Sequence, residues 1–579
     1  MLKKLLNLTL AAFLAVSFPA YAEEEAFVQI KVPFPDGDKI LHENYQKYSS
    51  IMLRYADDKK PIALCAYYDG YVWGTVPKEN ENRKTEVYFA DKTVFADETD
   101  EYEYYMMKKL AQRGIIFGDE NNNANPFDNI TRAEAVAITM RIIGVDESKS
   151  ADSGFDDVPA DMWCAPVVKK ARDMGIIKGT GEKNFEPERN VTREEMVIMA
   201  ARAVLAAGLK DEPQNVTAED LSRDGYVKDY ADVSAYALSA YKLIGTSTPC
   251  DHEDTGEIDP VGTPVNVGYL RPSKDITRFE TAEMADKICD YFQIYPSQTA
   301  IELGFDKKMP VIDGSTSTYP FTEAVYSCLF YNGYEHKEKP KKHSKSYASY
   351  EKLINGENDV IIASVYPAQE ILDLAKENNV ELELVPIAYD AMIFFTNKEN
   401  SIENLTQEQI TNIYVDNKYA NWEELGGPDA ALYPYARNYD SGSHAQMQRH
   451  FLHGKDINEK IRKETTSVTM SNVLTDVMDC MTENPKGYGL GYSIYYYFNN
   501  MNAFYNTFDR LKLLKIDGVA PNDETIASGE YPLSNNTYVV FRKDEPKDSP
   551  ARKFADFMLT DKGQLCVEVA GFGPLRKTE

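Results

Sequence analysis

Cysteine is scarce in this 579-residue sequence, and its seven cysteines neither cluster nor form a CxxC pair. Structural metal sites and redox centres use closely spaced cysteines, so the spacing argues against both classes of site. The odd count leaves at least one cysteine without a partner in the chain, and we expect buried free thiols.

Basic residues are also in short supply, because 63 Lys and Arg face 92 Asp and Glu, for a formal net charge of -29. This excess of acid repels phosphate backbones, so we expect no nucleic-acid partner. The 43% content of hydrophobic residues excludes a wholly disordered chain. The length exceeds that of a single core and predicts roughly three to five domains.

Long apolar runs are missing after the first 22 residues. Two lysines precede the mostly apolar stretch from Leu5 to Phe18, and Ala20-Tyr21-Ala22 forms a small-x-small cleavage site, so residues 1–22 are a predicted signal peptide. No cysteine follows that could carry a lipid anchor, and no later run approaches the ~18 apolar residues of a membrane span. We therefore expect a secreted protein that is held outside the membrane by other means.

A short motif occurs three times along the chain. Ile130-Thr131-Arg132-Ala133-Glu134 returns as Val191-Thr192-Arg193-Glu194-Glu195 and as Ile276-Thr277-Arg278-Phe279-Glu280. Each copy predicts a helix start, with Thr as N-cap and an acid three residues later. A second helical stretch precedes each copy, at 104–113, 165–174 and 236–243. We predict three helix–loop–helix modules, at 91–147, 148–210 and 211–295.

These motifs, with the Phe155-Asp156-Asp157-Val158 entry and Trp163, resemble the S-layer homology modules of bacterial envelope proteins. The resemblance implies an all-α three-module unit that binds secondary cell-wall polysaccharide or peptidoglycan. By position it nominates Arg132, Arg193 and Arg278 as contacts to the anionic polymer, with Trp163 beside the second groove. A guanidinium at a helix N-terminus is suited to a carboxylate. The alternative is that each arginine pairs only with a neighbouring acid.

The remaining segments of the first half carry no recognisable chemistry. Residues 23–90 alternate polar and apolar side chains between turns, which predicts a small β domain. The insertion at 251–262 imitates a calcium loop but has Gly262 where a bidentate Glu is needed. Residues 119–125 are rich in oxygen donors but lack the glycine of such a loop, so we expect both segments to be solvated loops.

After a predicted linker at 296–309, strands and helices alternate from residue 310 to 579, which predicts a two-lobed α/β domain with largely parallel sheets. Two loops that are rich in hydroxyls, at 313–320 and 437–443, each lie between a strand and a helix. Hydroxyls and free amides at a helix N-terminus form a typical anion-binding arrangement. Arg437 adds a full positive charge to the second loop.

Both loops, with Asn421-Trp422 and the run Gly487-Tyr488-Gly489-Leu490-Gly491-Tyr492, resemble the phosphate-binding proteins of phosphate ABC transporters, which have a type II periplasmic-binding-protein-like fold. The resemblance implies that two lobes close on inorganic phosphate or a similar oxyanion, which then passes to an ABC permease. By position it nominates the following ligand donors: Ser317, Thr318, the Tyr319 amide, Ser346, Arg437, Ser441, Gly442 and Ser443.

Two positions depart from that family's pattern. The acid that accepts the proton of monohydrogen phosphate falls at Val365, and valine cannot accept a proton. The acid that orients the arginine falls at Tyr439, although the adjacent Asp440 could substitute for it. Anion binding survives both changes, but without an acceptor at Val365 we expect sulfate to compete with phosphate.

The sequence offers little support for other chemistry. His444, His450 and His453 share one predicted helix, but no acid or cysteine at helical spacing completes a metal site, so we expect surface or capping roles. We find no nucleophile–base pair and expect neither an enzyme nor a cofactor.

The hypothesis is therefore a multidomain, cell-wall-anchored receptor that captures phosphate or a related oxyanion for ABC-type import. The alternative is a structural S-layer or envelope protein whose binding domain serves sensing or assembly.

Overall fold

The computed structural model describes residues 27–44, 47–144, 152–206, 251–258, 264–269, 271, 273–364, 366–439, 441–467, 470–502 and 506–576. The predicted signal peptide, the predicted helix at 236–243, Val365 and Asp440 lie outside these residues. The chain forms two compact units, Met1–Tyr295 and Pro296–Glu579. In the described part of the chain, no helix is long and apolar enough to cross a bilayer.

The N-terminal unit begins with the predicted β structure. Strands β1 (Phe27–Pro33), β4 (Tyr71–Pro77) and β3 (Cys65–Tyr68) form an antiparallel sheet in that order, while β2 (Tyr48–Tyr55) pairs with β5 (Thr85–Asp91). A short helix, α2 (Gly37–Glu43), follows β1. Asp69 and Gly70 join β3 to β4, and both have positive φ, of 49° and 79°, as a two-residue hairpin turn requires.

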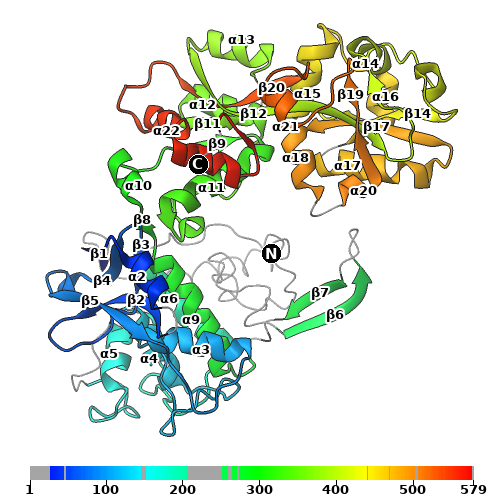
Figure 1. Cartoon of the computed structure of the whole chain (residues 1–579). Coiled ribbons are helices and arrows are strands. Elements are labelled where there is room, and N and C mark those ends of the chain that lie inside the picture. Colours follow the sequence, from blue (N-terminus) through cyan, green and yellow to red (C-terminus); the bar gives the residue numbers. More distant parts are fainter. Residues whose placement is uncertain are drawn as a thin grey trace, which may run out of the picture. The chain divides into compact units, whose positions relative to one another are not determined.

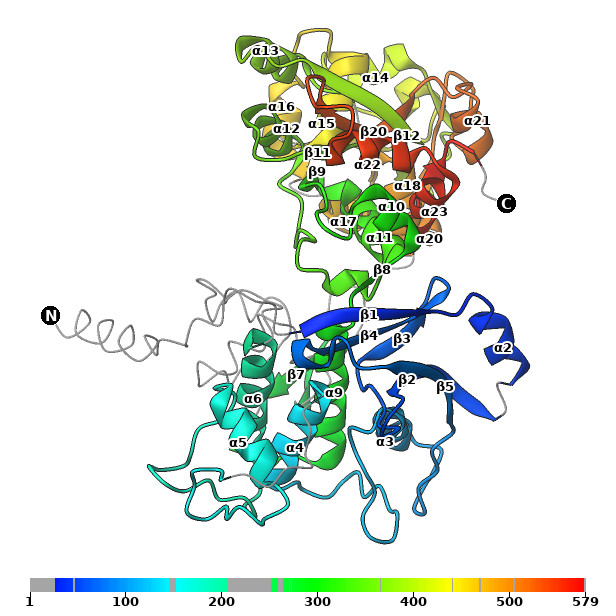
Figure 2. The ribbon, with the colours of Figure 1, turned by 90° about the vertical axis from the view of Figure 1, so that its left-hand side faces the viewer.

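Among the described residues of this unit, five helices complete the core: α3 (Tyr102–Gln112), α4 (Arg132–Ile142), α5 (Ala165–Asp173), α6 (Arg193–Ala206) and α9 (Arg278–Phe292). The helix starts that the motifs predict are confirmed, since α4 and α9 open with capping boxes on Thr131 and Thr277. Helix α9 packs against α3, α4 and α6 (Figure 2). Apolar side chains such as Met107, Val136 and Ile288 form the shared core.

The prediction of an all-α three-module unit is not confirmed. The insertion that we expected to be a solvated loop forms an antiparallel hairpin of β6 (Asp251–Ile258) and β7 (Pro264–Tyr269). Val265 and Val267 alternate with Asn266 and Gly268 in β7, which is the two-residue period of a strand. The oxygen-rich composition of the first strand concealed this signal.

The C-terminal unit contains an eight-stranded sheet, whose main path runs β14-β17-β12-β20-β11-β9. These strands span Ala431–Pro434, Gly487–Ile494, Leu382–Asn397, Ser534–Arg542, Val360–Ala363 and Ile312–Gly314, and β18 (Leu511–Leu513) and β21 (Gly573–Pro574) also pair with β12. Only β9–β11 and β14–β17 are parallel in that path, so the sheet is mixed rather than largely parallel as predicted.

Two long paired strands, β12 and β20, cross from one lobe of this unit to the other (Figure 1). The first lobe carries α11 (Tyr319–Leu329), α12 (Ser346–Asn355), α13 (Gln369–Glu377), α22 (Pro550–Met558) and α23 (Asp561–Val569). The second carries α14 (Gln407–Tyr414), α15 (Gly442–Met447), α16 (Glu459–Glu464), α17 (Met470–Glu483) and α18 (Tyr495–Asn500). The expected linker at 296–309 contains α10 (Gln298–Leu303) and belongs to this unit.

Candidate functional site

In the first lobe, serine hydroxyls from two loops meet at the ends of neighbouring parallel strands. Ser315 follows β9, and its Oγ lies 3.1 Å from Ser317 Oγ and 3.3 Å from Ser364 Oγ. Ser364 follows β11, which is parallel to β9, so the carboxyl ends of both strands meet at one edge of the sheet. Ser317 was predicted as a donor, whereas Ser315 and Ser364 were not.

The other two nominated donors of this loop are engaged within the protein. Thr318 is fully buried, and its hydroxyl lies 2.7 Å from the Ile362 carbonyl and 3.0 Å from that of Ser315. A hydroxyl has one proton to donate, so Thr318 anchors the loop and has no proton left for a ligand. The Tyr319 amide likewise donates to the Thr316 carbonyl.

A third element of this lobe presents Ser346 at the first position of α12. The preceding Lys345 has φ 79° and ψ 163°, a conformation that is essentially confined to glycine. Such a conformation costs roughly 1–3 kcal/mol, and it persists where the surrounding structure enforces it, often at ligand sites. Ser346 itself is half-buried, and its carbonyl accepts a hydrogen bond from Ser349 Oγ at 2.9 Å.

In the second lobe, neutral oxygen atoms hold the Arg437 guanidinium in a buried position. Arg437 lies in β15 (Ala436–Arg437) and is 3% exposed. Its Nε donates to the Ser467 carbonyl at 3.3 Å and its Nη2 to Asn438 Oδ1 at 3.2 Å. Both of these acceptors are neutral oxygen atoms. Tyr439, at the family's orienting position, donates its hydroxyl to Asp456 instead.

The second loop then enters α15, whose two serines have different environments. Ser441 is the N-cap, since its Oγ accepts from the His444 amide at 3.1 Å and donates to the Asn438 carbonyl at 2.9 Å. Ser443 is 1% exposed, and its Oγ has no hydrogen-bond partner among the described residues. Leaving a buried hydroxyl unsatisfied costs roughly 1–3 kcal/mol. Ser443 is therefore the nominated residue that most directly indicates a ligand.

A second guanidinium, which the sequence did not suggest, adjoins this loop. Arg462 in α16 donates from Nη1 to the Arg437 carbonyl at 2.5 Å and from Nη2 to Asp456 Oδ1 at 3.0 Å. From the sequence we expected a positive charge near this loop from Arg437 alone. Arg462 stands in an ordinary helical stretch 25 residues further on, and nothing in its local pattern distinguishes it.

The three histidines, for which we expected surface or capping roles, have different environments, because His444 is buried and His453 is exposed. Burial, together with the neighbouring Arg462 guanidinium, lowers the pKa of His444 to about 4. Burial and Arg449 lower the pKa of His450 to about 4 as well. Among the residues that the structure describes, no group of three or more His, Cys, Asp or Glu side chains converges on one point.

The two lobes are in contact at Tyr366. The Arg449 guanidinium, from the π-helical turn Gln448–Leu452 that continues α15, lies 5.5 Å from the centroid of the Tyr366 ring. Tyr366 directly follows Val365, and it is 42% exposed. A cation–π contact thus joins the second lobe to the first in this conformation.

In the N-terminal unit, the three motif arginines form a cyclic set of contacts. Their backbone amides donate to carbonyls of the next motif's loop, Arg132 to Arg189, Arg193 to Lys274 and Arg278 to Asp128, each at 2.8 Å. Their guanidinium groups meet the capping acids of neighbouring modules, Arg132 with Glu195 at 2.8 Å, Arg193 with Glu280, and Arg278 with Glu134 at 3.8 Å.

This geometry corresponds to the alternative in which each arginine pairs with a neighbouring acid. Arg132 and Arg193 are 6% and 1% exposed, so both guanidinium groups are withdrawn from solvent, while their acid partners are partly exposed. Trp163, in contrast, is 51% exposed. Wall-polymer binding by the arginines and by Trp163 stays a prediction.

Comparisons with known proteins agree with both resemblances. Residues 308–562 match the model of the PBP superfamily domain, and residues 96–136 and 154–197 match that of the S-layer homology domain. The chain thus combines segments that match the S-layer homology domain with a segment that matches the PBP superfamily domain. The third module lies outside the matched segments, but its Thr277 capping box and its place in the arginine ring repeat those of the first.

Individual relatives match one part of this chain or the other. The phosphate-binding protein PstS of Borreliella burgdorferi is 28% identical over 272 residues, which are 46% of this chain and 90% of the relative. A surface-layer 125 kDa protein of Lysinibacillus sphaericus is 26% identical over 225 residues, 38% of this chain and 17% of the relative. The crystal structure of PstS from Borrelia burgdorferi matches 47% of this chain and 100% of its own, with 24% identity and a TM-score of 0.33.

Proposed function

We propose that this protein captures inorganic phosphate or a related oxyanion outside the cell and delivers it to an ABC-type importer. Its S-layer homology domains indicate attachment at the cell surface, and its PBP superfamily domain is similar to a phosphate-binding protein. In this proposal the S-layer homology domains hold the receptor at the cell surface. The protein acts as a binding protein and not as an enzyme.

The buried Ser443 hydroxyl carries the proposal for the cleft. Ser443 lies in the first turn of α15, directly after Gly442, and Arg437 is six residues earlier in the chain. A hydroxyl, backbone amides and a guanidinium therefore belong to one short segment. An anion would accept hydrogen bonds from all three kinds of group, and charge-assisted bonds are the strongest of them. Ser315, Ser317 and Ser364 supply hydroxyls from the other lobe.

The proposal also concerns the protonation state of the anion that the site selects. Val365 provides no acceptor for the proton of monohydrogen phosphate, while Arg437 brings a positive charge to the second lobe. We therefore propose a site that does not require a proton on the oxyanion, so that sulfate competes with phosphate at neutral pH.

Calorimetric titration of the mature chain with phosphate, sulfate, arsenate and a phosphonate tests this function. Ser443→Ala should weaken binding, whereas Ser528→Ala, an exposed serine of the same lobe, should not. If none of the four anions binds, the transport role is wrong and the structural alternative gains support. If phosphate binds and sulfate does not compete, binding stands but the account of selectivity is wrong.

A further inference from the structure

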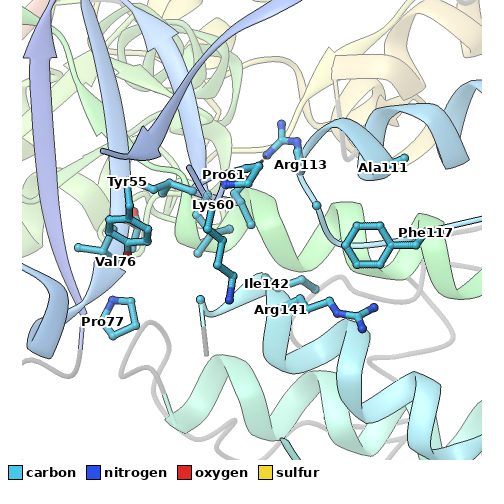
Figure 3. Close-up of a pocket in the computed structure, with 16 residues that line it drawn as sticks. Tyr55, Lys60, Pro61, Val76, Pro77, Ala111, Arg113, Phe117, Arg141 and Ile142 are labelled. Carbon is cyan, nitrogen blue, oxygen red and sulfur yellow. Dashed lines mark hydrogen bonds between the residues drawn. The ribbon is translucent and has the colours of Figure 1, made fainter. Parts of the chain in front are cut away.

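A cavity of about 210 Å³ lies within the N-terminal unit, between its β structure and the ends of α3 and α4 (Figure 3). Its basic residues, Lys60, Arg113 and Arg141, all take part in interactions within the protein. Among these, the two arginines donate to the carbonyls of Ala63 and Ile115. These side chains therefore belong to the packing of the unit, and we assign the cavity no ligand.

Two cysteines of the C-terminal unit lie next to each other, although they are far apart along the chain. Cys328 is near the end of α11 and Cys566 is in α23, and these two helices pack together (Figure 2). Their thiols are joined by a hydrogen bond. Both are free thiols in this structure, so the fold places two oxidisable groups in contact.

The packing of the two helices suits a covalent bond between them. Ala324 precedes Cys328 by one helical turn and Ala570 follows Cys566 by one turn, so each cysteine shares its helix face with a small buried side chain. Near the same contact, the rings of Phe321 in α11 and Phe572 after α23 have centroids 4.2 Å apart.

General helix geometry places facing residues at a suitable distance. Packed helices have axes roughly 8–10 Å apart, and Cα atoms lie about 2.3 Å from the axis. Facing Cα atoms at the closest point are therefore about 3.4–5.4 Å apart, and this range overlaps the roughly 4.4–6.8 Å that a disulfide spans.

The two thiols differ in the way that disulfide exchange requires. Cys328 is partly exposed, whereas Cys566 is buried. The hydrogen bond from Cys566 lowers the pKa of Cys328, and the positive charge of Lys562 acts in the same direction, against the effect of burial. The hydrogen bond to Cys328, together with burial, raises the pKa of Cys566. Because the thiolate is the nucleophile, Cys328 is the cysteine that an external reagent meets first.

We propose that Cys328 and Cys566 form an oxidation site, at which a small-molecule disulfide converts the two thiols into a disulfide bond between α11 and α23. The Cys328 thiolate attacks one sulfur atom of the external disulfide, which gives a mixed disulfide, and the released sulfur takes up the proton that Cys328 has lost. Cys566 then attacks Cys328 Sγ, and its proton passes to the second external sulfur as this leaves. Two protein thiols are oxidised and one external disulfide is reduced to two thiols.

The bond joins two segments that adjoin the serine loop and the crossing strand. Helix α11 begins at Tyr319, directly after the loop at 315–318, and β21 after α23 pairs with β12. Oxidation therefore ties the helix behind the serine loop to the C-terminal segment of the same lobe. The proposed location outside the cell permits disulfides, and the site does not depend on which anion the cleft binds.

Oxidation of the mature chain tests the proposal. The protein is incubated with oxidised or with reduced glutathione and unfolded in urea with iodoacetamide, and its peptides are analysed by mass spectrometry without reduction. The oxidised sample should contain a cross-linked species that joins the peptides of Cys328 and Cys566, whereas the reduced sample should contain both in alkylated form. Alkylation of both cysteines after oxidation would overturn the proposal. So would a glutathione adduct that persists on Cys328, because Cys566 would then fail to displace it.

Thermal unfolding of the oxidised and reduced samples measures the effect of the bond. A disulfide that closes a long loop stabilises a protein, so oxidation should raise the unfolding temperature of the C-terminal unit by about 5–10 °C. Cys328→Ala and Cys566→Ala should each abolish this rise. Cys480→Ala is the matched control and should keep it, because Cys480 is buried in α17 and hydrogen-bonds to Tyr435. A rise that persists in the folded Cys328 and Cys566 variants would contradict the assignment.

Discussion

Arg193 in α6 forms an ion pair with Glu280 in the first turn of α9, although only 1% of the Arg193 side chain is exposed. Glu280 also completes the capping box on Thr277, so one carboxylate serves both the helix start and the contact between modules. Arg132 and Glu195 repeat this relationship between α4 and α6. In this structure, the shared role of the repeated motif is to join neighbouring modules, through an ion pair between the arginine of one and the capping acid of the next.

Arg193→Ala should lower the free energy of unfolding by about 3–5 kcal/mol, because it removes a buried guanidinium and leaves Glu280, whose side chain is only 15% exposed, without its ion-pair partner. Arg189→Ala is the matched control, since the partly exposed Arg189 pairs with Glu195 and should contribute at most about 1 kcal/mol. Urea denaturation of the two variants measures both values. Equal losses would show that the ring of arginines does not hold the modules together.

Trp163→Ala should reduce cosedimentation with purified cell walls while changing the free energy of unfolding by no more than about 0.5 kcal/mol. The reason is that its side chain is 51% exposed and leaves no cavity when truncated. Tyr334→Ala, an exposed aromatic residue of the C-terminal unit that is 47% exposed, serves as the control. Unchanged cosedimentation of the Trp163 variant would remove this residue from the wall-binding surface.

The sequence predicted those features that depend on local patterns. The capping acids at Glu134 and Glu280 are three residues from their threonines, and the spacing alone identified both helix starts. Which acid each arginine meets could not be predicted, because Arg193 and Glu280 are 87 residues apart and only the packing of the modules brings them together.

The same distinction applies to the cleft. Thr318 and Ser443 have similar local settings in loops that enter helices, so the sequence nominated both as donors. The Thr318 hydroxyl donates to the carbonyl of Ile362 in β11, which is 44 residues away. No local sequence pattern predicts this hydrogen bond. The antiparallel course of β20 was missed for a related reason, since alternating strands and helices do not reveal strand direction.

Ser443→Ala should weaken binding without a loss of stability, whereas Thr318→Val should lower stability. Removal of the unsatisfied Ser443 hydroxyl should leave the free energy of unfolding equal or up to about 1 kcal/mol higher, yet weaken oxyanion binding by up to about tenfold. Thr318→Val loses a bond to the Ile362 carbonyl and should destabilise the protein by about 1–3 kcal/mol. Denaturation and calorimetry of both variants test this, and a Ser443 variant that binds like the parent would contradict the assigned site.

His450 should make the protein less stable as the pH falls from about 6.5 to about 4. Its folded-state pKa is about 4 because of burial, whereas the unfolded value is about 6.5. The unfolded state therefore binds more protons in this window, and stability is lost as the pH falls. His450→Phe should reduce the pH slope of the unfolding free energy there, while His42→Phe, at an exposed position, should not. Identical slopes would mean that His450 is protonated without cost.

Asp390 should make the protein less stable as the pH rises, which is the opposite of the effect of His450. It lies on β12, which crosses between the lobes. It is fully buried in β12, and burial raises its pKa to about 7, whereas the unfolded value is about 3.9. The folded state therefore holds the proton more tightly, so the stability contributed by Asp390 declines as the pH rises from about 4 to about 7 and stays reduced above that.

Asp390→Asn removes this cost and keeps an oxygen to accept the Ala391 amide, which lies 2.8 Å from Asp390 Oδ1. At pH 8 the variant should be more stable than the parent by up to about 4 kcal/mol, at 1.36 kcal/mol for each unit of pKa. At acidic pH the two proteins should converge. Asp373→Asn, an exposed position on α13, should show no such pH dependence. If Asp390→Asn were less stable than the parent at pH 8, the ionised carboxylate itself would be needed between the two crossing strands.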